Sequence, residues 1–354
     1  MKNMFKKGIL FSLVLLTYLN ARAQSWQIRL TDPPPIASIR GMSVVNDSVL
    51  WVSGTGGKAG VTTDAGAHWK WVTVPGHDSC DWRSLMAFSD KRALLLNAGE
   101  PAFMMLTTDG GDSWQEVYHN DTKGIFFDGI AFRNAAEGIA AGDPINGKFM
   151  IIQTKDSGRT WQLQEDAWRP AAADGEAIFA ASNSSVKRTG NGNGCFITGG
   201  KTSRFFIGWS DWKSVNWPIL SGGAGTGAFS IAFRGKNAVV AGGDYMNDTL
   251  ARLNCVYTTN GGKNWQLPVV SPAGFRSCVQ YISDKLLIAT GTSGTDISED
   301  GGLHWRNISK TGFHVAGVSP DGKRVWLAGS RKMGMIDIVP SQERGAAKST
   351  PGKK

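Results

Sequence analysis

Short apolar segments recur along the chain, each followed by a polar turn and a second apolar segment that ends in glycine. Clear examples span 83–100, 129–144, 229–245 and 276–292. Apolar segments of this length, bounded by turn residues, are typical of β-strands. Amphipathic helical segments do not alternate with them, which argues against a two-domain α/β fold. The pattern therefore predicts an all-β protein.

An eight-residue motif, Ser/Thr-x-Asp-x-Gly-x-x-Trp, follows these paired segments at 62–69, 107–114, 154–161, 258–265 and 298–305. Its acid position holds Asp64, Asp109, Asp156, Asn260 and Asp300. A side-chain oxygen at that position can accept backbone N–H bonds, glycine provides the positive φ, and the Trp buries apolar surface. Catalysis needs one special acid rather than five, and a calcium loop needs more ligands than one acid per turn. We therefore predict structural turns between strands.

The number of repeats follows from the marker tryptophans, which are Trp69, Trp114, Trp161, Trp217, Trp265 and Trp305. They are separated by 40 residues (305 − 265) to 56 residues (217 − 161), and Trp217 closes a degenerate copy at 210–217. A further strand pair at 314–330 lacks the motif, while the segment 25–30 resembles 113–118. Seven units of this length predict a seven-bladed β-propeller with four antiparallel strands per blade. The N-terminal strand is expected to close the last blade, because closure removes open sheet edges.

The two ends of the chain differ in composition from the 24–340 propeller. Residues 1–23 combine a basic head, a short apolar run and the sequence Ala-Arg-Ala, which predicts a signal peptide cleaved before Gln24. Because the residue after the cleavage site is not Cys, we expect no lipid anchor, and no later run is apolar enough for a membrane helix. Residues 341–354 predict a disordered basic tail. The expected location is the periplasm or the exterior.

Charge and cysteine content narrow the function further. Of the net charge of +9, residues 1–23 carry +4 and residues 341–354 carry +3, which leaves about +2 on the propeller and predicts no nucleic-acid partner. The four cysteines, Cys80, Cys195, Cys255 and Cys278, are scattered and show no metal-ligand spacing. Buried thiols are the default expectation, and three disulfide pairings remain open in an exported chain. No metal and no cofactor are predicted.

The repeated turns resemble the Asp-box, or bacterial neuraminidase repeat. Across nearly the whole propeller the chain is similar to the photosystem II assembly/stability factors, in the exported branch from non-photosynthetic bacteria that is often labelled oxidoreductase. The segments 98–111, 140–151 and 241–247 carry the similarity to that branch. The resemblance implies a binding protein that helps to assemble a larger complex. It specifies architecture far better than function.

Candidate ligand residues come from the predicted starts of the innermost strands, where propellers usually bind. These are Arg40, Arg83, Asp128, Asp174, Glu176, Arg276 and His314. The three arginines and His314 are predicted to occupy one continuous arc, where they could hold a carboxylate, a phosphate or an acidic peptide. The alternative is a polar collar in which the arginines pair with the acids.

A second candidate set follows the glycine of the second strand and comprises Glu100, Asp143 and Asp244, with Lys201 at the matching place. It could mark a cation or ligand site, and loop capping is the simpler account. The segment 181–194 is rich in Gly and Asn, which predicts a mobile loop.

The alternatives to a protein-binding function are a glycan-active hydrolase of the sialidase type, a glycan-binding propeller and an oxidoreductase. A sialidase would need an arginine triad and a Tyr–Glu nucleophile pair, but Arg40 is followed by Gly41 rather than by Ile-Pro. None of Tyr118, Tyr245, Tyr257 and Tyr281 is visibly paired with Glu. An oxidoreductase would need a dinucleotide, haem or metal motif, and none is visible. We expect a non-catalytic, monomeric binding or assembly propeller whose partner is a protein or peptide of the cell envelope.

Overall fold

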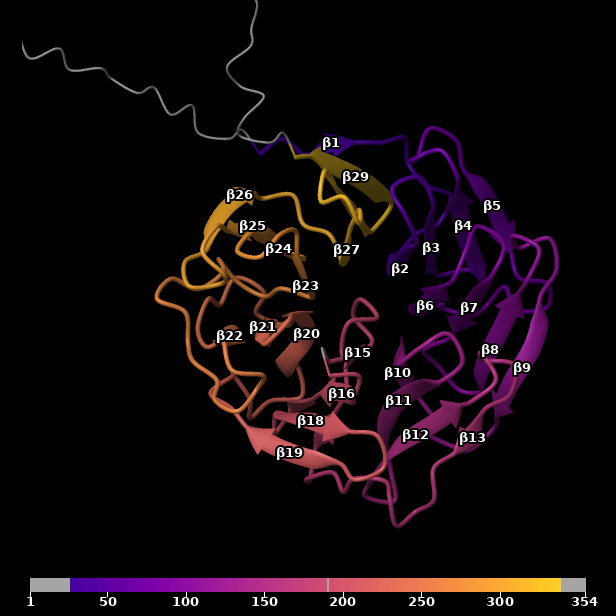
Figure 1. The fold of residues 1–354 in the computed structure, drawn as a ribbon, viewed down its shortest axis with the longest axis horizontal. Coiled ribbons are helices and arrows are strands. Elements are labelled where there is room, and N and C mark those ends of the chain that lie inside the picture. Colours follow the sequence, from indigo (N-terminus) through magenta and orange to yellow (C-terminus); the bar gives the residue numbers. More distant parts are fainter. Residues whose placement is uncertain (1–25, 190, 339–354) are drawn as a thin grey trace, which may run out of the picture.

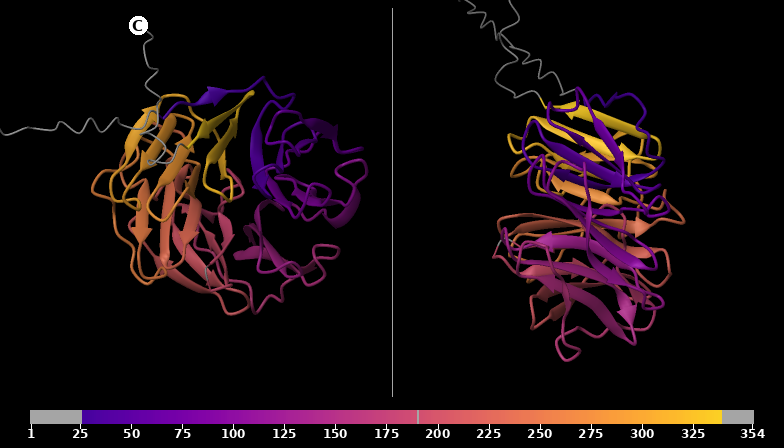
Figure 2. Two further views of the ribbon diagram at one scale, coloured as in Figure 1. Left: turned by 45° about the horizontal axis from the view of Figure 1, so that its top comes forward. Right: turned by 90° about the vertical axis from the view of Figure 1, so that its right-hand side faces the viewer.

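The computed structural model describes residues 26–189 and 191–338, which form a ring of seven twisted sheets around a central channel (Figure 1). All regular structure in these ranges is β-strand, and seen from the side the ring is a disc (Figure 2). The prediction of a seven-bladed propeller with four antiparallel strands per blade is therefore confirmed. The predicted signal peptide at 1–23 and the basic tail at 341–354 lie outside the described residues.

The first three blades follow one another along the chain, each running from the channel to the rim. Blade one contains β2 (Ile39–Val44), β3 (Leu50–Gly54), β4 (Lys58–Thr62) and β5 (Lys70–Thr73). Blade two contains β6 (Ser84–Ala87), β7 (Ala93–Leu96), β8 (Ala102–Thr107) and β9 (Gln115–Asn120). Blade three contains β10 (Phe127–Phe132), β11 (Gly138–Ile145), β12 (Lys148–Thr154) and β13 (Gln162–Leu163).

Blades four to six follow the same order, with one addition. Blade four contains β15 (Val186–Arg188), β16 (Gly194–Ile197), β18 (Arg204–Gly208) and β19 (Lys213–Asn216). Blade five contains β20 (Thr226–Arg234), β21 (Asn237–Asp244) and β22 (Cys255–Thr258), and a bridge between Tyr257 and Gln266 marks its outer edge. Two short strands, β14 (Glu176–Ala177) and β17 (Gly199–Gly200), extend its inner edge. Blade six contains β23 (Cys278–Tyr281), β24 (Leu287–Gly291), β25 (Gly294–Ser298) and β26 (Arg306–Ser309).

Blade seven joins the two ends of the described chain. It contains β27 (Val315–Val318), β28 (Arg324–Gly329) and β29 (Lys332–Asp337), and β1 (Arg29–Leu30) pairs with β29 as the outermost strand. In this pair Arg29 is opposite Met335 and Leu30 is opposite Gly334. Trp26, only 8% exposed, packs into the core of the same blade. Closure by the N-terminal strand is therefore confirmed.

The repeated motif forms a tight turn between the third and fourth strands. In the second copy the Thr107 hydroxyl donates to Asp109 Oδ1 at 2.8 Å and accepts the N–H of Gly111, while Asp109 also accepts the N–H of Ser113. The hydrogen bond from Ser113 Oγ, together with these bonds, lowers the pKa of Asp109 below its usual range. Equivalent hydroxyl contacts are made by Asp64, Asp156, Asn260 and Asp300.

The core lies between neighbouring blades, where apolar side chains of adjacent sheets interdigitate. Trp51 of blade one, for example, packs with Trp82 and Leu95 of blade two. All four cysteines are buried free thiols. Burial raises the pKa of the Cys195 thiol to about 12, so it remains protonated and unreactive.

The prediction of a mobile loop at 181–194 is wrong for residues 181–188. The segment contains β15, the innermost strand of blade four, and Ser182 to Ser185 are buried as they cross the channel. We call 181–185 the crossing segment. Asn183 donates to Leu85 O of blade two and accepts the N–H of Ile130 in blade three, while Ser182 donates to Ser277 O of blade six. These partners lie far away in sequence and satisfy the side chains of Ser182 and Asn183, two of the polar residues that make the segment look like a loop.

Candidate functional site

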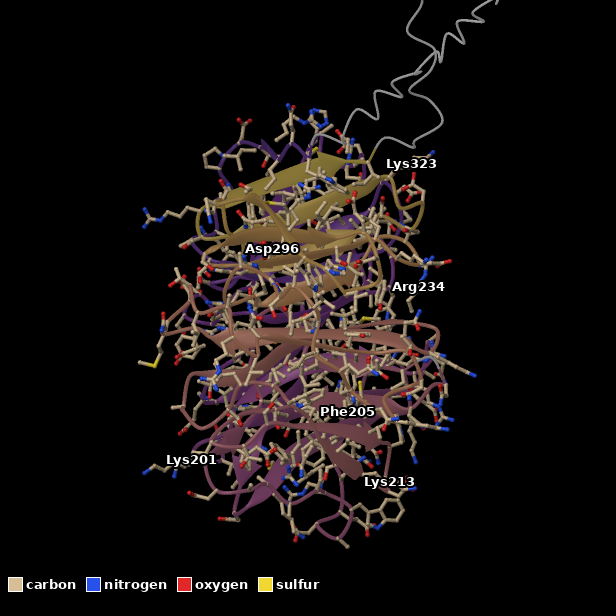
Figure 3. The ribbon with its side chains drawn as sticks, turned by 90° about the vertical axis from the view of Figure 1, so that its left-hand side faces the viewer. Lys201, Phe205, Lys213, Arg234, Asp296 and Lys323 are labelled. Atoms are coloured by element: carbon tan, nitrogen blue, oxygen red, sulfur yellow. The ribbon has the colours of Figure 1, made fainter. Side chains whose placement is uncertain are left out.

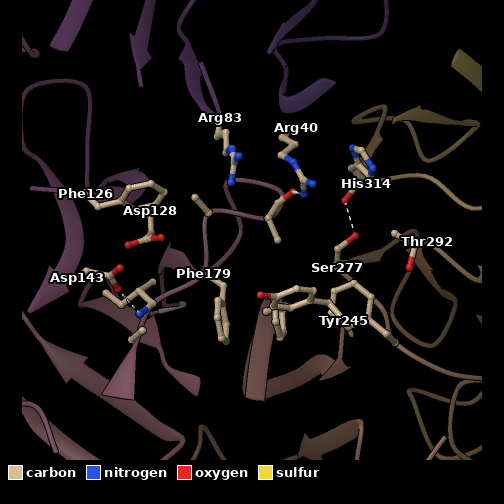
Figure 4. Close-up of a pocket in the computed structure, with 16 residues that line it drawn as sticks. Arg40, Arg83, Phe126, Asp128, Asp143, Phe179, Tyr245, Ser277, Thr292 and His314 are labelled. Carbon is tan, nitrogen blue, oxygen red and sulfur yellow. Dashed lines mark hydrogen bonds between the residues drawn. The ribbon is translucent and has the colours of Figure 1, made fainter. Parts of the chain in front are cut away.

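A cavity of about 430 Å³ opens at one mouth of the channel, above the crossing segment (Figure 4). Ligand pockets commonly have this size. Its wall is formed by Arg40, Arg83, Phe126, Asp128, Asp143, Ala177, Ile178, Phe179, Ala180, Ala181, Phe229, Tyr245, Phe275, Ser277, Thr292 and His314. We call this space the mouth cavity. A second hollow of about 410 Å³ lies against the opposite ends of the inner strands and is lined by Asn183 and Lys187, among others.

Three β-bulges at equivalent places turn side chains into the mouth cavity. The register of the innermost strand shifts at Arg40 in blade one, at Asp128 in blade three and at Phe229 in blade five. A bulge leaves one residue unpaired and re-aims its side chain, and bulges are frequent next to binding sites. The ring thus presents a cation, an acid and an aromatic ring from the same position of alternate blades.

Arginines dominate one side of the mouth cavity. Arg40 Nη1 donates to the backbone carbonyl of Ala181 at 3.3 Å. Arg83 lies beside it and pairs with Asp81 at 2.6 Å. Burial, followed by the charge of Arg83, lowers the pKa of Arg40 to about 10 against the opposing effect of Asp81. The Arg40 guanidinium therefore remains charged at neutral pH, and its repulsion from the neighbouring Arg83 favours an anion between the two groups.

His314 completes this side as a neutral group. Its Nδ1 lies 3.3 Å from Ser38 Oγ, and burial, followed by the charge of Arg40, lowers its pKa to about 4. The imidazole therefore offers one donor and one acceptor at neutral pH rather than a third positive charge. Arg83, Arg40 and His314 come from the consecutive blades two, one and seven and face the same space (Figure 4).

Two acids form the adjoining side. Asp128 is fully buried, and neither of its carboxylate oxygens has a hydrogen-bond partner among the described residues. The N–H of Ala180 approaches it and weakly favours the charged form, but without hydrogen-bond geometry. Burial, followed by the charge of Asp143, raises the pKa of Asp128 well above its usual value, with Arg83 opposing. Burial also raises the pKa of Asp143 to about 6, although its Oδ1 accepts the N–H of Ile178 at 2.9 Å.

Aromatic rings form the wall opposite the arginines. Phe179 and Phe229 stack with centroids 4.0 Å apart, and Phe275 meets Phe229 edge-on at 4.7 Å. Tyr245 is 51% exposed and borders the cavity beside Phe275. Sequence reasoning missed this wall. Its signals were an aromatic residue at the start of an inner strand (Phe229) and one beside a candidate acid (Tyr245), but neither belongs to the repeated motif.

The structure does not place Arg276 at the cavity. Its guanidinium is fully buried and pairs with the equally buried Asp296 of β25, which lies inside the disc (Figure 3). Gly291 lies against the Cα atom of Arg276, as Gly142 lies against the Cα atom of Phe127. Arg276 therefore corresponds to Phe127. Ser277, like Asp128, occupies the next position, which points to the cavity. A shift of one residue reverses the direction of a strand side chain.

Asp174 and Glu176 were predicted at the start of the inner strand of blade four, but β15 is that strand. Asp174 is exposed and pairs at 2.7 Å with Lys201, which projects from the surface (Figure 3). Glu176 is buried, accepts the Thr198 hydroxyl and pairs with Arg204. Neither acid lines the mouth cavity, because the residues that follow them form the cavity floor before the inner strand begins.

In the second candidate set, Asp143 alone lines the mouth cavity. Glu100 accepts the N–H of Gly124 at 2.6 Å, and Asp244 accepts the N–H of Met246 at 2.9 Å. Both bonds order exposed loops. The three acids of this set are therefore not brought together as one site.

Comparisons with known proteins were made for the whole chain. No family model matches it. A curated relative, the photosystem II assembly lipoprotein Ycf48 of Synechococcus sp. (strain CC9902), is 23% identical over 251 residues, which cover 69% of this chain and 67% of the relative. This chain is therefore similar in sequence to Ycf48.

Three solved structures are similar to this chain in fold. A structure described as YCF48 bound to D1 peptide aligns with a TM-score of 0.63 and 18% identity, covering 90% of this chain and 98% of that one. YCF48 from Cyanidioschyzon merolae aligns with a TM-score of 0.64 and 16% identity, covering 89% and 99%. A structure of U3-55K aligns with a TM-score of 0.61 and 12% identity, covering 88% and 98%.

The composition of the mouth cavity bears on the enzyme alternatives. Tyr245 and two arginines line it, but no glutamate does so in the part of the chain that the structure describes, whereas sialidase-type chemistry requires a Tyr–Glu pair. Within residues 26–189 and 191–338 no group of three or more His, Cys, Asp or Glu side chains is arranged to hold a metal ion. Across the same ranges, the structure contains no helix that is long and apolar enough to cross a membrane.

Proposed function

We propose that this chain is a binding propeller that captures a peptide or protein segment in its mouth cavity, where Arg40 and Arg83 hold a carboxylate of the ligand. The observation that carries the proposal is that Arg40 is charged and largely buried but has no acidic partner among the described residues. Its guanidinium is largely buried, bonds to a backbone carbonyl, and forms no ion pair with any acid of the described ranges. A like charge lies next to it. A ligand carboxylate would relieve this repulsion and replace lost hydration with paired hydrogen bonds.

The likeness to Ycf48 supports the partner class. One similar structure is described as bound to a D1 peptide, and the curated relative is named as an assembly protein. We extend both properties to this chain as a proposal: it binds a protein segment and assists an assembly step. We also propose from its first 23 residues that it works outside the cytoplasm, on a partner of the cell envelope, as a monomer.

The test uses the chain without residues 1–23 and an immobilised library of peptides, each in a free-carboxylate form and a carboxamide form. We expect binders to depend on a carboxylate, and we expect Arg40→Gln/Arg83→Gln to weaken their binding at least tenfold. Each lost bond to a charged group is worth about 1.5–3 kcal/mol, and 1.4 kcal/mol is tenfold.

The matched control is Arg234→Gln/Arg306→Gln, which removes the same charge from sites outside the cavity. Arg234 projects from the face opposite Lys201 (Figure 3). Unchanged affinity in the cavity variant, or an equal loss in the control, would contradict the proposal.

A further inference from the structure

The acidic side of the mouth cavity has no role in binding a carboxylate. Asp128 is 0% exposed, and both its oxygens lack partners in the described chain, yet it borders the cavity (Figure 4). Buried polar groups are almost always hydrogen-bonded, so an orphaned carboxylate at a cavity wall needs an explanation. An apolar residue would fill the same space without the free-energy cost of burying an unpaired polar group.

Asp143 stands next to Asp128 by the same structural device. The register of β11 against β12 shifts at Asp143, as that of β10 against β11 shifts at Asp128. Two bulges on neighbouring strands therefore aim two acids at one side of the cavity. Of the two oxygens of Asp143, Oδ1 accepts the N–H of Ile178, which leaves Oδ2 available.

The charged and titratable groups around the two acids are Arg83 and Asp81 from the segment before β6, Arg40 from β2, and His314 from the segment before β27. Arg83 pairs with Asp81 at 2.6 Å and has no ion pair with either Asp128 or Asp143. His314 is neutral at physiological pH. The protein therefore supplies the acids with no direct counter-ion in the ranges described.

We propose that Asp128 and Asp143 form a subsite for a primary ammonium group of the ligand, from either a lysine side chain or an N-terminal amine. An ammonium carries three donors, which match the two oxygens of Asp128 and the available oxygen of Asp143 when both acids are ionised, and its positive charge favours that ionised state. A calcium ion would need six to eight oxygen ligands, and two carboxylates are too few for it. The subsite deepens the proposed function, because a ligand held by both sides would carry a carboxylate and an ammonium close together.

The proposal predicts a pH dependence with a definite sign. The ammonium is charged throughout the range, so binding requires ionised acid. With the pKa of Asp143 at about 6, the pair is largely neutral at pH 5 and carries negative charge at pH 7. Binding should therefore strengthen as the pH rises from 5 to 7, and a bound ammonium should in turn lower the pKa of Asp143.

The test uses n-butylammonium chloride, which has no carboxylate and therefore does not depend on the arginines. Carbon-13 NMR of Asp-labelled protein should show that this probe shifts the carboxyl signals of Asp128 and Asp143 and lowers the apparent pKa of Asp143. Asp128→Asn/Asp143→Asn should weaken binding at least tenfold. Asp211→Asn, which changes an exposed acid outside the cavity, is the matched control. If the double variant does not fold, Asp143→Asn alone serves the same purpose.

Two model compounds identify the source of the ammonium. Nα-acetyl-lysine N-methylamide presents only a side-chain ammonium, and alanine N-methylamide presents only an α-amine; binding by either supports the subsite and names its source. The proposal is overturned if neither binds, if n-butanol binds as well as n-butylammonium, or if the double variant retains binding. Loss of peptide binding in the arginine variants does not enter this test, so the two proposals fail separately.

Discussion

Replacing Arg276 by methionine tests whether this residue supports the fold rather than the ligand. Arg276 Nε donates to Asp296, and Nη1 donates to Phe275 O at 2.7 Å and to Ser293 Oγ at 2.9 Å. Arg276→Met removes these bonds and leaves the Asp296 carboxylate buried. Breaking a buried ion pair by removing one partner costs about 3–5 kcal/mol.

That cost sets the size of the expected change. In a domain larger than 250 residues, 1 kcal/mol lowers Tm by ~2 °C, so Tm should fall by roughly 6–10 °C. Urea unfolding followed by tryptophan fluorescence and calorimetry would measure both quantities. The double variant Arg276→Met/Asp296→Asn should recover part of the loss, because it leaves no unpaired charge. Arg306→Gln, an exposed control, should change stability by less than ~0.5 kcal/mol.

Binding distinguishes the two roles of Arg276. Since its side chain does not line the mouth cavity, Arg276→Met should capture peptides with wild-type affinity at temperatures well below its Tm. A loss of stability below about 1 kcal/mol, or a loss of binding without any change in Tm, would refute the structural role.

The remaining predictions concern titration and the turns. Between pH 4 and 6.5, His314 binds a proton in the unfolded chain but not in the folded chain, so this residue makes the free energy of unfolding rise with pH. His314→Gln should remove that rise, which is on the order of 2 kcal/mol. Asp143 acts in the opposite sense, because folding raises its pKa from 3.8 to about 6. Its contribution to the free energy of unfolding is therefore lost as the pH rises through this window. Asp143→Asn should remove that loss, again on the order of 2 kcal/mol. Urea unfolding at pH steps from 4 to 7 measures both, and a profile parallel to the wild type in either variant would contradict the assignment. In the turns, Asp109→Asn should be tolerated better than Asp109→Ala in thermal unfolding, since an amide already fills this position at Asn260; equal melting of the two variants would show that the Oδ1 contacts are unimportant.

The fold could be predicted from the sequence because the same turn motif recurs in five of the repeating units. Each copy of the repeated turn closes through hydrogen bonds between residues at most four positions apart, such as Thr107 with Asp109 and Asp109 with Ser113, so the motif alone predicts its local structure. Counting tryptophans then gave the blades, and the similarity of 25–30 to 113–118 gave the closure. The crossing segment failed by the same logic. Ser182, Asn183 and Ser184 bond to other blades, and nothing in the local sequence distinguishes them from loop residues.

The mouth cavity was only partly predictable. Arg40, Arg83, Asp128 and His314 begin inner strands and were identified by position alone. Arg276 was assigned one residue early, because Arg-Ser at 276–277 reads like Arg-Ser at 83–84, although the two strands align with different offsets. Bulges and offsets depend on pairing between strands, which a single strand's sequence does not reveal. The aromatic wall was missed because its four rings come from separate segments.

The crossing segment changes what kind of repeat protein this is. An ordinary propeller resembles a closed row in which each blade touches its two neighbours, and its stability is close to a sum over adjacent pairs. Here Ser182, Asn183 and Ser184 act as spokes, joining blade four directly to blades two, three, five and six, and Arg40 adds blade one through Ala181. The hub makes non-adjacent blades interdependent. Such a ring cannot unfold one blade at a time from the closing strand pair. A ligand that breaks the bond between Arg40 and Ala181 would also weaken the contact between blade one and the crossing segment.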